Sequence, residues 1–229
     1  MTESIRPSLE ERAGVYGALS DPRRLAICDL LELSDRTPSE LAARLDISSS
    51  LLAHHLSVLG AAGLTTTVSS SGDRRRRYVR LRRGVAEVLR TATSVSPASV
   101  LFVCTQNSAR SQLALALWQQ RSRIPATSAG TRPARSVHAG ARRAAARHGL
   151  DLSRAVPRAL APEDLQSGLV VTVCDEANES LATPGLERLH WSIPDPVAAG
   201  SARAFEETFE ELVERVSTLH TASGDRRSA

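Results

Sequence analysis

The chain has 229 residues, of which 41% are hydrophobic, enough for one large domain or two small ones with buried cores. No apolar run approaches the length of a membrane span, and the first residues lack the pattern of a signal peptide, so we expect a cytoplasmic protein without a membrane partner. The 29 basic residues, all arginine, barely exceed the 25 acidic ones, so net charge alone does not indicate a nucleic-acid partner. Three scattered cysteines, Cys28, Cys104 and Cys174, exclude a disulfide scaffold.

The sequence pattern changes near the middle of the chain. From residue 8 to about residue 90, short amphipathic helices lead into a basic hairpin, whereas from residue 98 onward apolar strands alternate with helices. Between them, residues 91–99 are small and polar with one proline, which is typical of a linker. We therefore predict two domains, residues 1–95 and residues 96–229.

The first half predicts a winged helix-turn-helix and is mainly α-helical. Thr37-Pro38-Ser39-Glu40 forms a capping box that starts one helix, and a second helix over residues 48–62 ends at Gly63. Residues 64–81 then form two β-prone arms of a hairpin with four consecutive arginines, Arg74 to Arg77. In such a fold the second helix enters the DNA major groove and the wing contacts phosphates.

This half resembles the ArsR family of winged-helix repressors over nearly all of residues 10–90, above all in His54-His55-Leu56 and Ala62-Gly63-Leu64. The resemblance implies a homodimer, formed by the helices predicted over 9–19 and 84–92, on a double-stranded DNA operator. The residues expected to contact bases or phosphates are Ser49, Ser50, Ala53, His54, Arg74, Arg75, Arg76 and Arg77. Two plainer interpretations stay open: a solvated charged hairpin, and a purely structural histidine pair.

The helices in which ArsR-family members place paired thiolates or histidines carry none here. Cys28 stands alone in the helix before the helix-turn-helix, and one thiol per chain does not supply the about three thiolates that arsenite prefers. We expect Cys28 to be a core residue. No metal site is predicted.

The most informative segment is residues 100–118, an apolar β-run followed by Cys104, five residues, Arg110, Ser111 and a helical stretch. In a loop between a strand and a helix N-terminus, backbone amides can turn inward and form an anion nest, which also stabilises a thiolate. Arg110 adds a planar fork that holds two oxygens of a tetrahedral oxyanion. The expected oxyanion ligands are Thr105, Gln106, Asn107, Ser108, Ala109 and Arg110. The plainer alternative is a buried cysteine before a helix-capping loop.

Further along, the sequence predicts a helix over residues 137–148, a buried strand over 169–174 and a long helix over 201–219. Alternating strands and helices indicate an α/β domain with a parallel sheet and helices on both faces. Ligands of such sheets bind at the carboxyl ends of the strands, where Cys104 is expected.

From residue 99 to about residue 219 the chain looks like the low-molecular-weight protein tyrosine phosphatase fold, through Cys-x5-Arg-Ser, Ser128-Ala129-Gly130-Thr131 and Asp195-Pro196. Within that fold, phosphotyrosine phosphatases compete with thiol-coupled arsenate reductases. Three features favour the reductases: Cys174 after a buried strand, the stretch HWSIPDP, and the lack of a tyrosine after Asp195-Pro196.

The resemblance implies the roles of the site residues. Cys104 attacks the arsenic of arsenate, Arg110 and the loop amides hold its oxygens, and Asp195 protonates the departing hydroxide. Ser111 donates a hydrogen bond to the thiolate, and Asn107 braces the loop by side-chain bonds to its backbone. Asp195 could instead be only a turn residue.

A second thiol must release arsenite, and Cys174 is the candidate. The thioredoxin-coupled reductases carry a third cysteine seven residues later, where this chain has Leu181. We therefore expect no tightly bound cofactor but an external thiol reductant, either mycothiol with a mycoredoxin-like (glutaredoxin-like) partner or a thioredoxin-like protein. Cys174 as an inert core residue is the alternative.

Three hypotheses for the whole chain follow. It is a repressor fused to a working arsenate reductase, a regulator whose second half senses arsenate or phosphate without turnover, or a phosphotyrosine phosphatase tethered to DNA. The complete set of Cys104, Arg110, Ser111 and Asp195 favours the first, because binding alone needs neither a nucleophile nor an acid.

Overall fold

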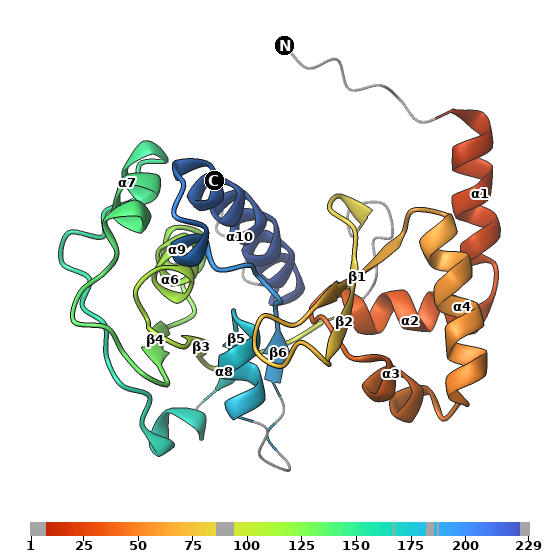
Figure 1. Ribbon diagram of the computed structural model, residues 1–229, viewed down its shortest axis with the longest axis horizontal. Coiled ribbons are helices and arrows are strands. Elements are labelled where there is room, and N and C mark those ends of the chain that lie inside the picture. The colour runs from red at the N-terminus through yellow and green to blue at the C-terminus, as the bar shows by residue number, and fades with distance from the viewer. Residues whose placement is uncertain (1–7, 86–93, 167, 182–185, 187, 225–229) are drawn as a thin grey trace. The chain divides into compact units, whose positions relative to one another are not determined.

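The computed structural model describes residues 8–85, 94–166, 168–181, 186 and 188–224 (Figure 1). The chain divides into two compact units, residues 1–68 with 77–91 and residues 69–76 with 92–229. The domain boundary near residue 95 stays a prediction. Within the described ranges, no helix is long and apolar enough to cross a membrane.

Four helices make up most of the first unit: α1 (Leu9–Leu19), α2 (Pro22–Glu32), α3 (Pro38–Leu45) and α4 (Ser49–Ala61). The predicted capping box at the start of α3 is confirmed, since Thr37 accepts from the Glu40 amide and the Glu40 carboxylate accepts from the Thr37 amide. Helix α3 ends at Asp46, which adopts a left-handed conformation with φ of 50°. This sharp end produces the turn of the helix-turn-helix.

The wing of the first unit consists of β1 (Thr65–Ser69) and β2 (Arg77–Leu81), which pair in a two-stranded sheet. The core of this unit holds fully buried residues from α2, α3 and α4, among them Leu31, Leu41 and Leu59. Cys28 is part of this core, and burial raises the pKa of its thiol to about 12. The predicted core role of Cys28 is therefore confirmed. Most of the helix predicted over 84–92 lies outside the described residues.

The second unit is built on four parallel strands in the order β4-β3-β5-β6. Their bounds are β3 (Val100–Cys104), β4 (Ala126–Gly130), β5 (Leu169–Thr172) and β6 (Arg188–His190). All five residues of β3 are buried, so both faces of this inner strand are covered, as its unbroken apolar sequence predicts.

The helices of the second unit are α6 (Arg110–Arg121), α7 (Ala139–Arg147), the 3-10 helix η1 (Pro162–Leu165), α8 (Asp175–Ser180), α9 (Pro196–Ala199) and α10 (Ala202–Ala222). Helix α6 packs on β3 and β4 and lies beside α10, whereas α8 contacts β3 and β5 (Figure 1). The fully buried Trp118 and Trp191 both lie against Phe102 of β3. The predicted parallel α/β sheet is confirmed.

One predicted strand is too long. The apolar run over 169–174 continues to Cys174, but β5 ends at Thr172. Cys174 instead caps the N-terminus of α8, because its sulfur accepts a hydrogen bond from the Ala177 amide. Since all four strands run in the same direction, their carboxyl ends meet at one edge, where the loops that follow them form the site.

Candidate active site

The loop between β3 and α6, residues 104–110, surrounds the sulfur of Cys104. The sulfur accepts a hydrogen bond from the Asn107 amide at 3.2 Å and lies 3.1 Å from Ser111 Oγ. Asn107 adopts a left-handed conformation with φ of 49°, which asparagine tolerates better than most residues. An amide aimed at the sulfur is what the predicted anion nest requires at this position.

The side chain of Asn107 determines the direction of the bonds around Cys104. Its Nδ2 donates to Ser111 Oγ at 2.8 Å and to Ser128 Oγ at 2.9 Å, and its Oδ1 accepts from the Arg158 amide at 3.0 Å. Because Ser111 Oγ accepts a hydrogen bond from Asn107 Nδ2, its own proton can point toward the Cys104 sulfur. Ser111 and the Asn107 amide can thus both donate hydrogen bonds to the Cys104 sulfur.

The prediction that Asn107 bonds the loop's own backbone is therefore wrong. The Asn107 amide is engaged by the sulfur, and the side chain finds its partners in β4, in α6 and at Arg158. Gln112 adds a further contact, since its Nε2 donates to Asn107 Oδ1 at 3.1 Å. The sequence contained Gln112 and Ser128 but gave no signal that their side chains meet Asn107.

Gly130, the last residue of β4, lets that strand approach the loop. A Cβ at this position would lie 2.8 Å from the Thr105 carbonyl oxygen and 3.0 Å from the Asn107 amide nitrogen. Backbone atoms this close cannot move aside cheaply, so only glycine fits. This close approach explains the Ser-Ala-Gly-Thr segment that follows the cysteine loop in the sequence.

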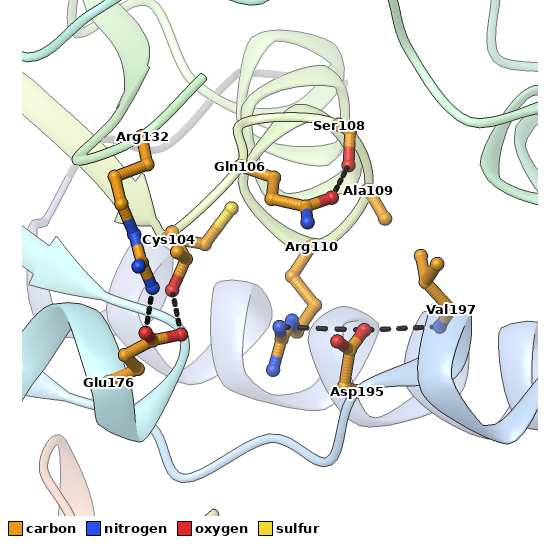
Figure 2. Close-up of a pocket in the computed structure, with 10 residues that line it drawn as sticks. Cys104, Gln106, Ser108, Ala109, Arg110, Arg132, Glu176, Asp195 and Val197 are labelled. Atoms are coloured by element: carbon orange, nitrogen blue, oxygen red, sulfur yellow. Dashed lines mark hydrogen bonds and ion pairs between the residues drawn. The ribbon is translucent and has the colours of Figure 1, made fainter. Parts of the chain in front are cut away.

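The side chains of Arg110 and Asp195 lie next to one another in the site (Figure 2). The buried guanidinium of Arg110 donates to the Ile193 carbonyl at 2.8 Å, and its Nη2 lies 3.5 Å from Asp195 Oδ1. Asp195 also accepts from the Val197 amide at 3.0 Å and thereby caps α9. The acid predicted from Asp195-Pro196 thus lies beside the predicted oxyanion-binding arginine.

These groups line a cavity of about 370 Å³. Its lining residues are Cys104, Thr105, Gln106, Ser108, Ala109, Arg110, Arg132, Glu176, Asp195 and Val197. Cys104 is only 3% exposed, because the loop wraps around it, yet it is one of the residues that line the cavity. The cavity therefore gives an anion access to the sulfur.

Cys174 lies close to this cavity. Its sulfur is 3.4 Å from Thr105 Oγ1 and accepts from the Ala177 amide at 3.4 Å. Burial raises the pKa of the Cys174 thiol; Arg110 opposes this shift and Cys104 adds to it. The two thiols predicted to take part in one reaction are thus brought together at the ends of adjacent strands.

Arg132 and Glu176 also line the cavity, and they were not predicted as site residues from the sequence. They form an ion pair at the edge of the cavity, and Glu176 Oε2 also accepts from the Thr105 hydroxyl at 3.0 Å (Figure 2). Both residues follow the carboxyl end of a parallel strand, where ligands of such sheets bind, and this position could have indicated that they belong to the site.

Asp175, the residue after Cys174, forms a buried pair with His190. His190 Nε2 is 3.1 Å from Asp175 Oδ1, and its Nδ1 is 3.0 Å from Thr172 Oγ1. Burial acts to raise the pKa of Asp175, but the hydrogen bond with His190 and further bonds outweigh it, so the pKa lies below its usual value.

In the first unit, the residues predicted to contact bases share one exposed face of α4: Ser49, Ser50, Ala53 and His54. His55, the next residue, is buried. Of the wing arginines, Arg77 belongs to the first unit, whereas Arg74 to Arg76 lie in the segment 69–76 of the second unit. All four are exposed, and Arg75 pairs with Asp73 at 3.1 Å. The geometry is compatible with a DNA-reading helix and a basic wing, and the contacts themselves stay predictions.

Comparison with protein families separates the two halves. Residues 99–228 match the model of the low molecular weight phosphotyrosine protein phosphatases. The chain belongs to this family. Residues 21–67 match the model of the bacterial regulatory proteins of the arsR family, so the helix-turn-helix is of ArsR type.

Individual relatives point the same way. The chain is 33% identical over 131 residues to an arsenate reductase of Halalkalibacterium halodurans, covering 52% of this chain and 93% of that protein. It is 42% identical over 48 residues to the transcriptional repressor SdpR of Bacillus subtilis, covering 21% of this chain and 53% of the repressor. The tyrosine phosphatase Wzb of Escherichia coli K30 shares the fold of the second unit, with a TM-score of 0.51 at 21% identity over 55% of this chain and 97% of Wzb.

Proposed function

We propose that this protein is a DNA-binding repressor joined to an arsenate reductase. The observation that carries the proposal is the placement of two thiols: Cys104 lines the cavity with the Asn107 amide directed at its sulfur, and the Cys174 sulfur lies 3.4 Å from the hydroxyl of Thr105, which also lines the cavity. The arsenate reductase relative, which aligns over this half of the chain, supports the same assignment.

In the first step, the Cys104 thiolate attacks the arsenic of arsenate. A sulfur–arsenic bond forms as an arsenic–oxygen bond breaks, and Asp195 donates the proton with which the oxygen leaves as water. Arg110 and the loop amides hold the other oxygens. Asp195 lies on the cavity wall beside Arg110, as this role requires.

In the second step, the Cys174 thiolate attacks the Cys104 sulfur. A disulfide forms, and the electron pair of the sulfur–arsenic bond stays with arsenic, which is reduced from As(V) to As(III) and leaves as arsenite. Two equivalents of an external thiol then reduce the disulfide. Because Leu181 stands where a third cysteine would accept the disulfide, we propose mycothiol with a mycoredoxin-like partner or a thioredoxin-like protein as the donor.

The two other hypotheses fit the site less well. Hydrolysis of a phosphate ester needs one thiol, so a phosphatase leaves the neighbouring Cys174 without a role. A sensor without turnover needs neither the sulfur-directed amide nor Asp195. The reductase uses every one of these groups.

For the first unit we propose a homodimer that binds a double-stranded DNA operator. Support comes from the ArsR-type helix-turn-helix, from the exposed face of α4 and from the four exposed arginines of the wing. The helix predicted over 84–92 would form part of the dimer interface, and most of it lies outside the described residues.

The deciding experiment assays the full chain with arsenate and each thiol donor, beside hydrolysis of an aryl phosphate. Repeated turnover, with more than one arsenite per chain, only in the presence of a thiol donor supports the proposal. Aryl phosphate hydrolysis alone makes the protein a phosphatase, and neither activity makes it a sensor. Cys104→Ser is expected to abolish turnover and retain oxyanion binding. Cys28→Ala is the matched control, because Cys28 lies in the core of the first unit, and it is expected to retain activity.

A further inference from the structure

A continuous set of contacts joins the edge of the cavity to the second thiol. Arg132 pairs with the carboxylate of Glu176, Glu176 Oε2 accepts from the Thr105 hydroxyl at 3.0 Å, and Thr105 Oγ1 lies 3.4 Å from the Cys174 sulfur. Figure 2 shows Arg132 and Glu176 beside Cys104. Neither charged residue has a role in the reaction proposed above.

The chemistry of these groups fixes the direction of each hydrogen bond. A carboxylate only accepts, and a hydroxyl has one proton to donate. Since the proton of Thr105 goes to Glu176, Thr105 Oγ1 can only accept from Cys174, and the donor must be the thiol proton. The contacts at Cys174 therefore match a protonated sulfur and leave Thr105 unable to donate to a thiolate.

We propose that Glu176 is a positioning residue that, by accepting the only hydroxyl proton of Thr105, holds Cys174 as a thiol until the carboxylate is displaced. The inference rests on the proposed function, in which Cys174 is the second thiol. Once the Glu176 carboxylate moves away from Thr105, the Thr105 hydroxyl rotates and donates a hydrogen bond to the Cys174 sulfur. This hydrogen bond stabilises the thiolate form of Cys174.

The displacement has a physical cause within the site. Arg132 and Glu176 line the same cavity as the Cys104 loop, and their side chains are 70% and 51% exposed. An oxyanion bound at the loop competes with Glu176 for Arg132, which weakens the ion pair, and it repels the Glu176 carboxylate, which is thereby pushed away from Thr105. Cys174 thus becomes reactive after the anion is bound, which suppresses a disulfide formed without substrate.

Other groups around Cys174 act on it as well. Burial and the neighbouring Cys104 disfavour the thiolate, whereas Arg110 and the Ala177 amide favour it. A hydrogen bond donated by the Thr105 hydroxyl also lowers the pKa of Cys174, and it is this bond that Glu176 withholds by accepting the hydroxyl proton. The carboxylate of Asp175 is held by His190. The contact between Glu176 and Thr105 can be changed by substitution without altering any of these groups.

The test measures the pKa of Cys174 directly, by NMR of the carbon-labelled Cys174 Cβ in the full chain carrying Cys28→Ala and Cys104→Ser. Glu176→Ala is expected to lower this pKa by about one unit, a tenfold gain in thiolate at neutral pH. Glu176→Gln removes the charge but keeps an oxygen that accepts from Thr105, so it is expected to lower the pKa much less.

Thr105→Val separates the hydrogen bond from the charge. In the Thr105→Val background, Glu176→Ala is expected to leave the pKa of Cys174 nearly unchanged. An unchanged pKa in Glu176→Ala, equal decreases in Glu176→Ala and Glu176→Gln, or an undiminished decrease in the valine background would each overturn the proposal. The titration contains no arsenate, so its failure is distinct from a failure of the arsenite assay.

Discussion

At the scale of single residues, the direction of one hydrogen bond determines the environment of the Cys104 sulfur. Asn107 donates to Ser111 Oγ, which lies 3.1 Å from that sulfur. The side-chain amide of Asn107 is oriented by the Arg158 backbone N–H and by Gln112. Arg158, which lies far beyond the next strand in the sequence, therefore helps to determine which way the Ser111 proton points at Cys104.

The pair of Asp175 and His190 makes the stability of the second unit depend on pH. The pKa of Asp175 is lowered in the folded protein, so the carboxylate contributes stability above the usual carboxyl pKa of about 3.9, and this contribution is lost as the pH falls through the lowered value. Asp175→Asn is expected to reduce the free energy of unfolding at pH 7 by about 1 to 3 kcal/mol and to flatten its decrease in acid.

Urea denaturation of both proteins in steps from pH 7 to pH 3 checks this expectation. Glu163→Gln, at an exposed position on η1, is the control and should unfold like the unmodified chain. Parallel stability curves for Asp175→Asn and the unmodified chain would remove Asp175 as a source of the pH dependence.

At the scale of elements, local patterns in the sequence predicted much that the structure confirms. Three of these features depend on residues that are neighbours in the sequence: the capping box of α3, the hairpin of the wing and the helix predicted over 137–148, which the structure shows as α7. The end of β5 is different. Apolar residues continue to Cys174, but the Ala177 amide turns that cysteine into a helix cap, and this choice depends on the backbone beyond the strand.

The wing allows a prediction at this scale. Replacing Arg74 to Arg77 with glutamine is expected to weaken binding to a random-sequence DNA duplex and to reduce the slope of log K against log salt by about 0.9 for each phosphate that the wing no longer neutralises. A salt titration of binding measures the slope. The matched control replaces four exposed arginines outside the wing, namely Arg135, Arg142, Arg143 and Arg154, and should preserve more of the affinity.

If both quadruple variants show the same decrease in affinity and slope, the effect comes from total charge and the wing has no special role. If the wing variant binds as the unmodified chain does, the four arginines are only a solvated hairpin.

At the scale of the whole molecule, the change from short helices to alternating strands predicted two folds in one chain, and the family matches confirm both. That Cys104, Arg110 and Asp195 line one site was also predictable, since each stands in a short motif. The residues at the edge of the cavity could not be predicted in this way. Arg132 and Glu176 come from loops after different strands, and only the folded sheet brings them beside Thr105.

Two separate hydrophobic cores predict two unfolding transitions. Leu41 lies in the core of the first unit and Leu113 in that of the second, and both are fully buried. Replacement of either leucine by alanine is expected to cost about 2 to 5 kcal/mol and to lower only the transition of its own unit. Differential scanning calorimetry resolves the two. A single transition that both variants shift equally would show that the units unfold together.

If Cys104 and Cys174 together reduce arsenate, as proposed, a first turnover needs no external thiol. The reduced full chain is mixed with arsenate in the absence of any external thiol, and arsenite, free thiols and disulfide-linked peptides are quantified. We expect one arsenite per chain, a disulfide between Cys104 and Cys174, and Cys28 still a thiol. Three intact thiols and no arsenite would contradict it.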